Sequence, residues 1–137
     1  LVDQLADLLE RRVTEAIQGQ ASGMDRVRVA LETCLDTFGR YRRAAKIMLV
    51  QAVGLGTVFE AKRNQVTERF ARLIEGYLRE AIANGEIEPV DVQVISLAWM
   101  GAIYALVIRW INTNEPEPQR IIDSLVPALL RSVGYDR

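Results

Sequence analysis

The chain has 137 residues, of which 50% are hydrophobic and 26% charged, and its formal net charge is −1. This composition is typical of one folded domain with a substantial apolar core, and it argues against a disordered segment or a strongly basic nucleic-acid-binding module. One cysteine excludes an internal disulfide, and the lack of histidine removes the usual zinc, non-haem iron and general-base arrangements. We therefore expect no metal site, no cofactor and no catalytic residue, and the lack of an opening signal peptide makes the cytoplasm the default compartment.

Apolar residues recur at helical spacing along the whole chain, and strand signals are absent. The expected helices cover approximately residues 2–17, 22–39, 41–54, 59–84, 91–111 and 121–133. Ser22, with Asp25 three residues on, resembles a capping box for the second helix, and Gly39 marks the expected end of that helix. Pro127 lies inside the last pattern and should kink the sixth helix or force a restart. Six helices without strands or internal repeats predict an all-α antiparallel bundle that forms one domain over residues 1–137.

The fifth predicted helix is apolar on every side, so it must be buried on every side. Its length of about 30 Å would also fit a membrane. However, the uninterrupted apolar run covers only residues 97–108, and Arg109 has no basic flank to set an orientation. These features favour a buried helix over a membrane span. One side carries small residues and the other carries bulky ones, which include Ile95, Trp99, Ile103, Leu106 and Trp110.

The small residues predict a close helix contact with a second copy of the chain, because so short a chain cannot cover this apolar surface alone. We expect a homodimer built mainly from the fifth and sixth helices. The predicted interface residues are Ala98, Gly101, Ala105, Ile108, Leu125, Leu129 and Val133.

Aromatic, methionine and aliphatic residues on helices two to five could surround a ligand. The predicted lining residues are Leu31, Cys34, Phe38, Met48, Phe59, Arg63, Phe70, Trp99 and Ile103. The same stripe of side chains also fits an ordinary core, and both interpretations stay open at this point. Cys34 could be a redox sensor, although a lone cysteine on an apolar helix face usually behaves as a small buried hydrophobe.

Positive charge is concentrated in the middle of the sequence, where residues 37–72 hold eight basic and two acidic side chains. Arg63 interrupts the apolar stripe of the fourth helix, so it either anchors a ligand's carboxylate or phosphate or extends along its stem to the surface. We assign Arg42, Arg43 and Lys46 to a site for an anionic head group. The alternative is a solvated basic face.

The order of helices and three sequence segments resemble the C-terminal domain of the TetR family of transcriptional repressors. The segments are YRRAAKIM at residues 41–48, LREAIANGEI at 78–87, and AWMGAI at 98–103 with Trp110 downstream. The resemblance implies a four-helix dimer contact from the last two helices and an effector pocket among the middle ones. It also implies a preceding three-helix domain that binds operator DNA. Leu1 begins in mid-pattern, so we expect that further chain precedes it.

Three classes of function are compatible with the sequence. The first is the effector-binding and dimerisation domain of a TetR-type regulator, in which a small molecule shifts the population of DNA-competent dimers. The turn at residues 84–87 and its flanks resemble TetR-type regulators of fatty-acid metabolism, which implies a fatty acyl-coenzyme A as effector. The second is a structural dimerisation module without a ligand. The third is a helical enzyme, but the sequence lacks a Glu-x-x-His motif, a phosphate loop and a nucleophile-base pair.

Overall fold

The computed structural model describes residues 2–136, and within this range the fold is all-α. Its elements are α1 Val2–Ala16, α2 Gly23–Arg40, α3 Arg42–Lys46, the π-helical turn η1 Ile47–Gln51, the 3₁₀ turn η2 Ala52–Leu55, α4 Thr57–Ala83, α5 Val92–Thr113 and α6 Pro118–Ser132. The predicted bundle is therefore confirmed, with one difference in the region before α4.

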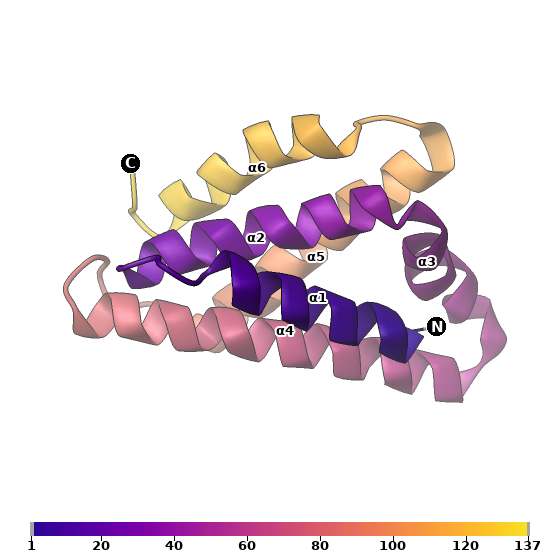
Figure 1. The fold of residues 1–137 in the computed structure, drawn as a ribbon, viewed down its shortest axis with the longest axis horizontal. Helices are drawn as coiled ribbons and strands as arrows, with labels where there is room; N and C mark the ends of the chain where they lie inside the picture. The colour runs from indigo at the N-terminus through magenta and orange to yellow at the C-terminus, as the bar shows by residue number, and fades with distance from the viewer. Residues whose placement is uncertain (1, 137) are drawn as a thin grey trace.

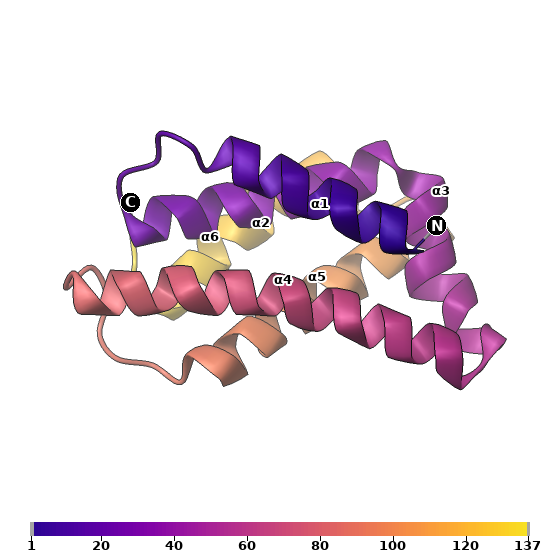
Figure 2. The same cartoon turned by 60° about the horizontal axis from the view of Figure 1, so that its bottom comes forward.

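Helix α2 lies at the centre of the bundle, with α6 on one side and α1 and α4 on the other (Figure 1). Helix α5 crosses the bundle obliquely and packs against both α4 and α6 (Figure 2). Consecutive long helices run in opposite directions, as short connections require. The N-terminus lies near α3, and the C-terminus lies at the opposite end of the molecule.

The first turn of α2 is held by two side chains and by a close backbone contact; we call this region the capped end. The Ser22 hydroxyl accepts a hydrogen bond from the Asp25 N–H at 3.0 Å, as the capping-box pattern predicts. The Glu86 carboxylate accepts from the N–H groups of Gly23 at 3.1 Å and Met24 at 3.3 Å. A Cβ on Gly23 would lie only 2.6 Å from the Tyr77 carbonyl oxygen. Glycine is therefore required where α2 begins against α4.

Helix α6 does not restart at Pro127, which was one of the two outcomes expected there, and Gly39 is not the last residue of α2. Helix α6 continues through Pro127, and its first turn is capped by the Glu117 carboxylate. Asp123, whose carbonyl loses its helical partner to Pro127, is exposed, so water can satisfy that carbonyl. Gly39 does not end α2, which extends to Arg40; a Cβ there would approach the Pro118 ring atoms to 3.0 Å. Gly39 permits close packing of α2 against α6.

The region from residue 40 to residue 59 is irregular, and we call it the basic end. The predicted single helix over 41–54 is instead the short α3 followed by one π-helical and one 3₁₀ turn. Gly56, with φ of 100°, then separates these turns from α4. Changes of helix type in one short stretch are frequent at functional sites, because they redirect side chains that a regular helix would hold in register.

Candidate functional site

Half of the basic side chains in residues 37–72 are neutralised by neighbouring carboxylates. Four of the eight form ion pairs: Arg40 with Asp36, Lys62 with Asp3, Arg69 with Asp7 and Glu10, and Arg72 with Glu68. The other four are Arg42, Arg43, Lys46 and Arg63, and none of them forms an ion pair with a residue in the range 2–136. The unpaired cations are thus the same four that the sequence pattern assigns to a ligand.

Arg42 has partners, but they are neutral. Its Nη2 donates to the Ile111 carbonyl oxygen at 2.8 Å and to Asn114 Oδ1 at 2.9 Å. Its guanidinium carbon lies 5.0 Å from the centre of the Trp110 ring. Arg42 therefore caps the C-terminal end of α5, where backbone carbonyls lack helical partners and favour a cation. The sequence pattern, which assigns Arg42 to the head-group site alone, does not reveal this role.

Arg42 and Arg43 line an open groove of about 690 Å³ at the basic end, together with Arg40, Tyr41, Ala44 and Ile47. Arg43 and Lys46 are exposed. The groove combines guanidinium donors with apolar surface, so its chemistry suits an amphipathic anion.

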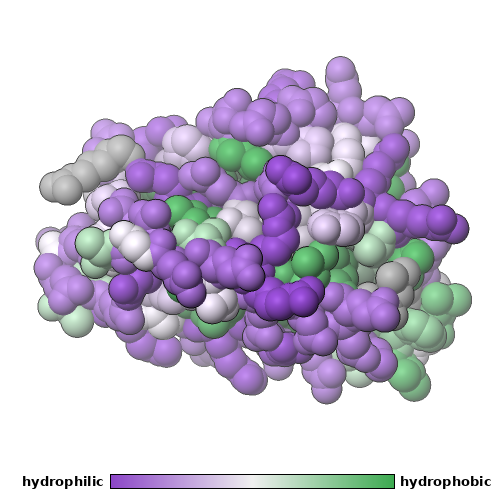
Figure 3. Space-filling view, viewed as in Figure 1, coloured by the Kyte–Doolittle hydropathy of each residue, from purple (hydrophilic) through white to green (hydrophobic). Residues whose placement is uncertain are grey.

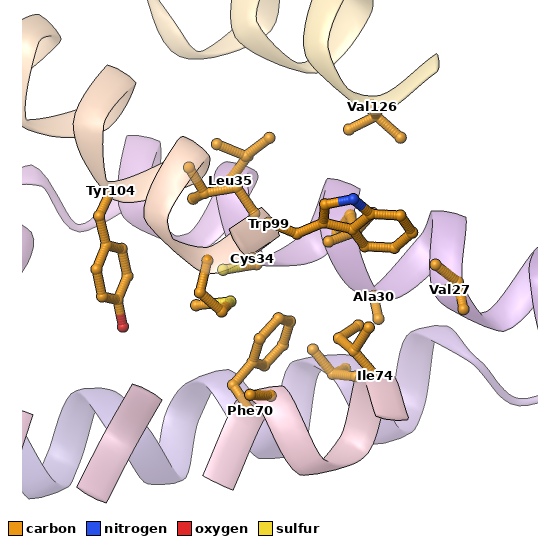
Figure 4. Close-up of a cluster of buried hydrophobic side chains, with 14 of the residues drawn as sticks. Val27, Ala30, Cys34, Leu35, Phe70, Ile74, Trp99, Tyr104 and Val126 are labelled. Carbon is orange, nitrogen blue, oxygen red and sulfur yellow. The ribbon is translucent and has the colours of Figure 1, made fainter. Parts of the chain in front are cut away.

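Seven of the nine predicted lining residues lie in one buried cluster. Figure 4 labels Cys34, Phe70 and Trp99 among them. The seven are Leu31, Cys34 and Phe38 of α2, Met48 of η1, Phe70 of α4, and Trp99 and Ile103 of α5. Each exposes at most 3% of its surface. An effector can reach them only if side chains move apart, so the predicted cavity stays a prediction. Burial raises the pKa of the Cys34 thiol, which favours an ordinary core residue over a redox sensor.

Phe59 departs from the predicted lining. It is 38% exposed and lies in the first turn of α4, close in sequence to Leu55 and Val58, which are 58% and 68% exposed. Figure 3 shows hydrophobic surface gathered at the end of the molecule where η2 leads into α4. Phe59 belongs to this surface and not to the core, because the first turn of α4 projects beyond the helices that bury its later turns.

Arg63 reaches the inside of the bundle through its contact with Tyr104. Its guanidinium carbon lies 5.7 Å from the centre of the Tyr104 ring, and its Nε is buried without a hydrogen-bond partner. The Tyr104 hydroxyl lies 2.7 Å from Thr67 Oγ1, which also donates to the Arg63 carbonyl oxygen at 3.0 Å. Burial raises the pKa of the Tyr104 hydroxyl. The sequence patterns did not single out Thr67 and Tyr104. The four-residue spacing between Arg63 and Thr67 does place these two residues on one face of α4.

The small-residue face of α5 points away from the core. Ala98, Gly101 and Ala105 are exposed, and so are Val94 at 58% and Leu97 at 45%. Ile108 of α5 and Leu125 and Leu129 of α6 are half-buried. Val133, in contrast, is 5% exposed and belongs to the core, at the C-cap position of α6.

Helix α5 is long and apolar enough to cross a membrane, and 44% of its most apolar window is buried in the chain. The core helix of a soluble protein has the same properties, so this is weak support for a span. Its bulky side holds Trp99 and Ile103, which are buried among the other helices.

Comparisons with known proteins agree with this architecture. The family described as "Tetracyclin repressor-like, C-terminal domain" matches residues 20–133. No curated protein matches the chain. A solved structure of the transcriptional regulator FadR from Bacillus subtilis, in complex with stearoyl-CoA, has the same fold with a TM-score of 0.80 and 18% sequence identity. The match covers 99% of this chain and 72% of that one.

The fold and the family match define the C-terminal domain of a tetracycline repressor-like protein. The chain belongs to the tetracycline repressor-like C-terminal domain family, as residues 20–133 establish. This confirms the resemblance that the three sequence segments predicted.

Proposed function

We propose that this domain senses a molecule with a long apolar chain and an anionic head, and that the effector is a fatty acyl-coenzyme A. The observation that carries the proposal is the set of four cations without carboxylate partners in the part of the chain that the structure describes; of these, Arg43 and Lys46 are exposed at the basic end. The similarity in fold to FadR, whose structure contains stearoyl-CoA, supports the same ligand class.

The two parts of such a ligand match two neighbouring regions of the chain. The phosphates would lie in the groove near Arg43 and Lys46, where exposed charges give steering and modest affinity. The acyl chain would enter the core between η1 and α4 and contact Phe38, Met48 and Phe70. Each buried methylene would contribute about 0.8 kcal/mol before the costs of association and of parting the core side chains.

Arg42 connects the head-group site to α5. Its donors now satisfy Ile111 and Asn114, and a phosphate that recruited Arg42 would leave the end of α5 uncapped. Since α5 also carries the exposed face described above, ligand binding at the basic end would bias the position of that face.

Titration calorimetry with a long-chain acyl-coenzyme A at low and high salt tests the proposal. We expect binding that weakens with salt and that weakens by about tenfold in the double variant Arg43→Ala/Lys46→Ala, because two charged contacts are lost. The control is Arg72→Ala/Arg79→Ala, which removes two exposed arginines that pair with acids of their own helix. Absence of binding to the unmodified domain would refute the proposal, and binding insensitive to salt and to Arg43→Ala/Lys46→Ala would refute the head-group site.

We further propose that the chain is a homodimer through the outer face of α5 and α6, formed by Ala98, Gly101, Ala105, Ile108, Leu125 and Leu129. The single chain leaves this apolar face exposed, and a self-complementary contact would bury it in both copies. A Cβ at Gly101 would meet no atom within 4 Å in the single chain. Gly101→Leu should therefore leave folding intact and weaken association by overpacking the contact, which sedimentation equilibrium measures. A monomeric unmodified domain at micromolar concentration would contradict the dimer.

In the whole regulator, we propose that a preceding helix-turn-helix domain binds operator DNA and that the protein acts in the cytoplasm, as a non-enzymatic repressor. A structural dimerisation module without effector is the second candidate. The closed packing of Leu31, Cys34, Met48 and Ile103 favours it, because none of these side chains has any exposed surface. The same calorimetric experiment separates the two functions.

A further inference from the structure

The one buried side-chain nitrogen or oxygen without a hydrogen-bond partner, among the described residues that are not exposed, is Nε of Arg63. Buried donors of this kind are rare, since most buried polar groups in folded proteins have a partner. Arg63 also lacks an ion pair among residues 2–136. Its position inside the apolar stripe of α4 thus leaves a cation that needs an acceptor from outside the chain.

The surroundings of Arg63 fix its direction but supply no acceptor for it. The Tyr104 ring lies beside the guanidinium at 5.7 Å, and Phe38 meets Tyr104 edge to face with ring centres 6.1 Å apart. Thr67 has one hydroxyl proton, so if it donates to the Arg63 carbonyl oxygen, Tyr104 must be the donor in the contact with Thr67. The Thr67 and Tyr104 hydroxyls are satisfied by one another and by the Arg63 carbonyl oxygen, and the donor left without a partner is Arg63 Nε.

The cluster borders the apolar core. Figure 4 shows the Tyr104 ring between α5 and α4, on the same side of α5 as Cys34 and Phe70. Tyr104 and Ile111 are two helical turns apart on α5, or about 10 Å at 1.5 Å per residue. The Ile111 carbonyl oxygen accepts a hydrogen bond from Arg42, which also lines the groove. An oxygen bound at Arg63 would therefore lie deeper in the molecule than phosphates bound at the groove.

We propose that Arg63 binds the acyl carbonyl oxygen of the effector, with Tyr104 as a positioning residue that holds the guanidinium through its ring. This inference rests on the proposed function. An acyl group joined by a spacer to a phosphate supplies two acceptors: the carbonyl oxygen for Arg63 and the phosphate for the groove. A hydrocarbon chain without the carbonyl oxygen leaves Arg63 without an acceptor, so the site discriminates an acyl thioester from an alkyl compound of equal length.

The test compares two probes that differ in that oxygen: hexadecanoyl-coenzyme A and its thioether analogue S-hexadecyl-coenzyme A. For the unmodified domain, calorimetry should give a dissociation constant about tenfold lower for the thioester, which is the usual size of one hydrogen bond to a charged group. Arg63→Met keeps the aliphatic stem and should bind both probes equally. Arg63→Leu, which also lacks a donor, should do the same, and it serves if Arg63→Met fails to fold.

Two further variants test the assignment of roles. Arg72→Met removes an exposed arginine of the same helix, which pairs only with Glu68 among the described residues, and should keep the preference for the thioester. Tyr104→Phe keeps the ring that holds the guanidinium, so this variant should also keep the preference for the thioester. Tyr104→Leu removes the ring and should reduce that preference.

The outcomes separate this inference from the proposed function. Equal binding of the two probes by the unmodified domain, or an unchanged preference in both Arg63 variants, would overturn the role of Arg63 and leave acyl-coenzyme A sensing intact. Binding of neither probe by the unmodified domain would overturn both.

Discussion

The two ends of the bundle meet the same requirement, the satisfaction of polar groups next to an apolar core, in opposite ways. At the capped end, Ser22 and Glu86 bind the N–H groups that begin α2, and Gly23 lets the backbones of α2 and α4 approach closely. At the basic end, the exposed Arg43 and Lys46 lack carboxylate partners among the described residues, and Leu55 and Val58 are exposed to solvent. The first arrangement stabilises the fold, and the second leaves groups that a ligand can satisfy.

Interactions that stabilise the fold and groups that are available to a ligand are therefore located at different ends of this small helical domain. A region that has satisfied all of its donors gains little from a ligand. A region with unpaired cations, apolar surface and irregular helical turns costs stability, and binding partners recover that cost. Substitutions at the capped end should therefore change the free energy of unfolding, and those at the basic end should change ligand affinity.

The largest expected effect is at Gly23. In Gly23→Ala the new Cβ would lie 2.6 Å from the Tyr77 carbonyl oxygen and 2.8 Å from the Ala81 nitrogen, both backbone atoms that cannot move alone. We expect a loss of about 3 kcal/mol in the free energy of unfolding, measured with urea. Gly76→Ala is the control, because a Cβ there meets no atom within 4 Å, and its higher helix propensity should add up to about 1 kcal/mol. Equal changes in the free energy of unfolding for Gly23→Ala and Gly76→Ala would contradict the close-packing role of Gly23.

The next effect is at Glu86. Replacement by Gln keeps the shape of the side chain and removes the negative charge beside the first N–H groups of α2. The expected loss in unfolding free energy is about 1 kcal/mol, the usual value of a helix cap and its interaction with the helix dipole. Glu88→Gln changes an exposed carboxylate two residues on and should shift the urea midpoint very little. A larger loss at Glu88 than at Glu86 would contradict the capping role.

The smallest effect is at Val58, in the exposed part of the basic end. Val58→Ala should change the unfolding free energy by less than about 0.5 kcal/mol, because the side chain is already 68% exposed. The same change at Val66, which is 5% exposed two turns later on α4, should cost about 2 kcal/mol. If Val58→Ala instead proves as costly as Val66→Ala, the apolar surface at the basic end is covered in solution and cannot be a free binding surface.

The sequence predicted most of the helices because each one carries a complete local signal. The boundaries of α4 follow from the glycine at residue 56 and the Asn84-Gly85 stop, and α5 follows from an apolar block that begins after Pro89. The prediction failed between residues 41 and 55, where the pattern of apolar residues fits several helical geometries. Packing against α4 and α5 selects the π-helical and 3₁₀ turns there.

For the candidate site too, some features follow from the sequence and others from packing. Residue type and spacing were sufficient to predict the all-α class, the family, the clustering of basic residues and the two contrasting sides of α5. Only the tertiary structure shows which four cations lack carboxylate partners among the described residues, because Asp3, Asp7 and Glu10, which pair with Lys62 and Arg69, lie on α1, far away in sequence. The tertiary structure also shows that Arg42 caps α5 and that the Tyr104 ring lies beside Arg63. It places Phe59 at the surface and Val133 in the core, the reverse of what was expected for each residue. Each of these facts depends on a contact between residues distant in the chain, and the spacing of residues within one helix carries no information about such contacts.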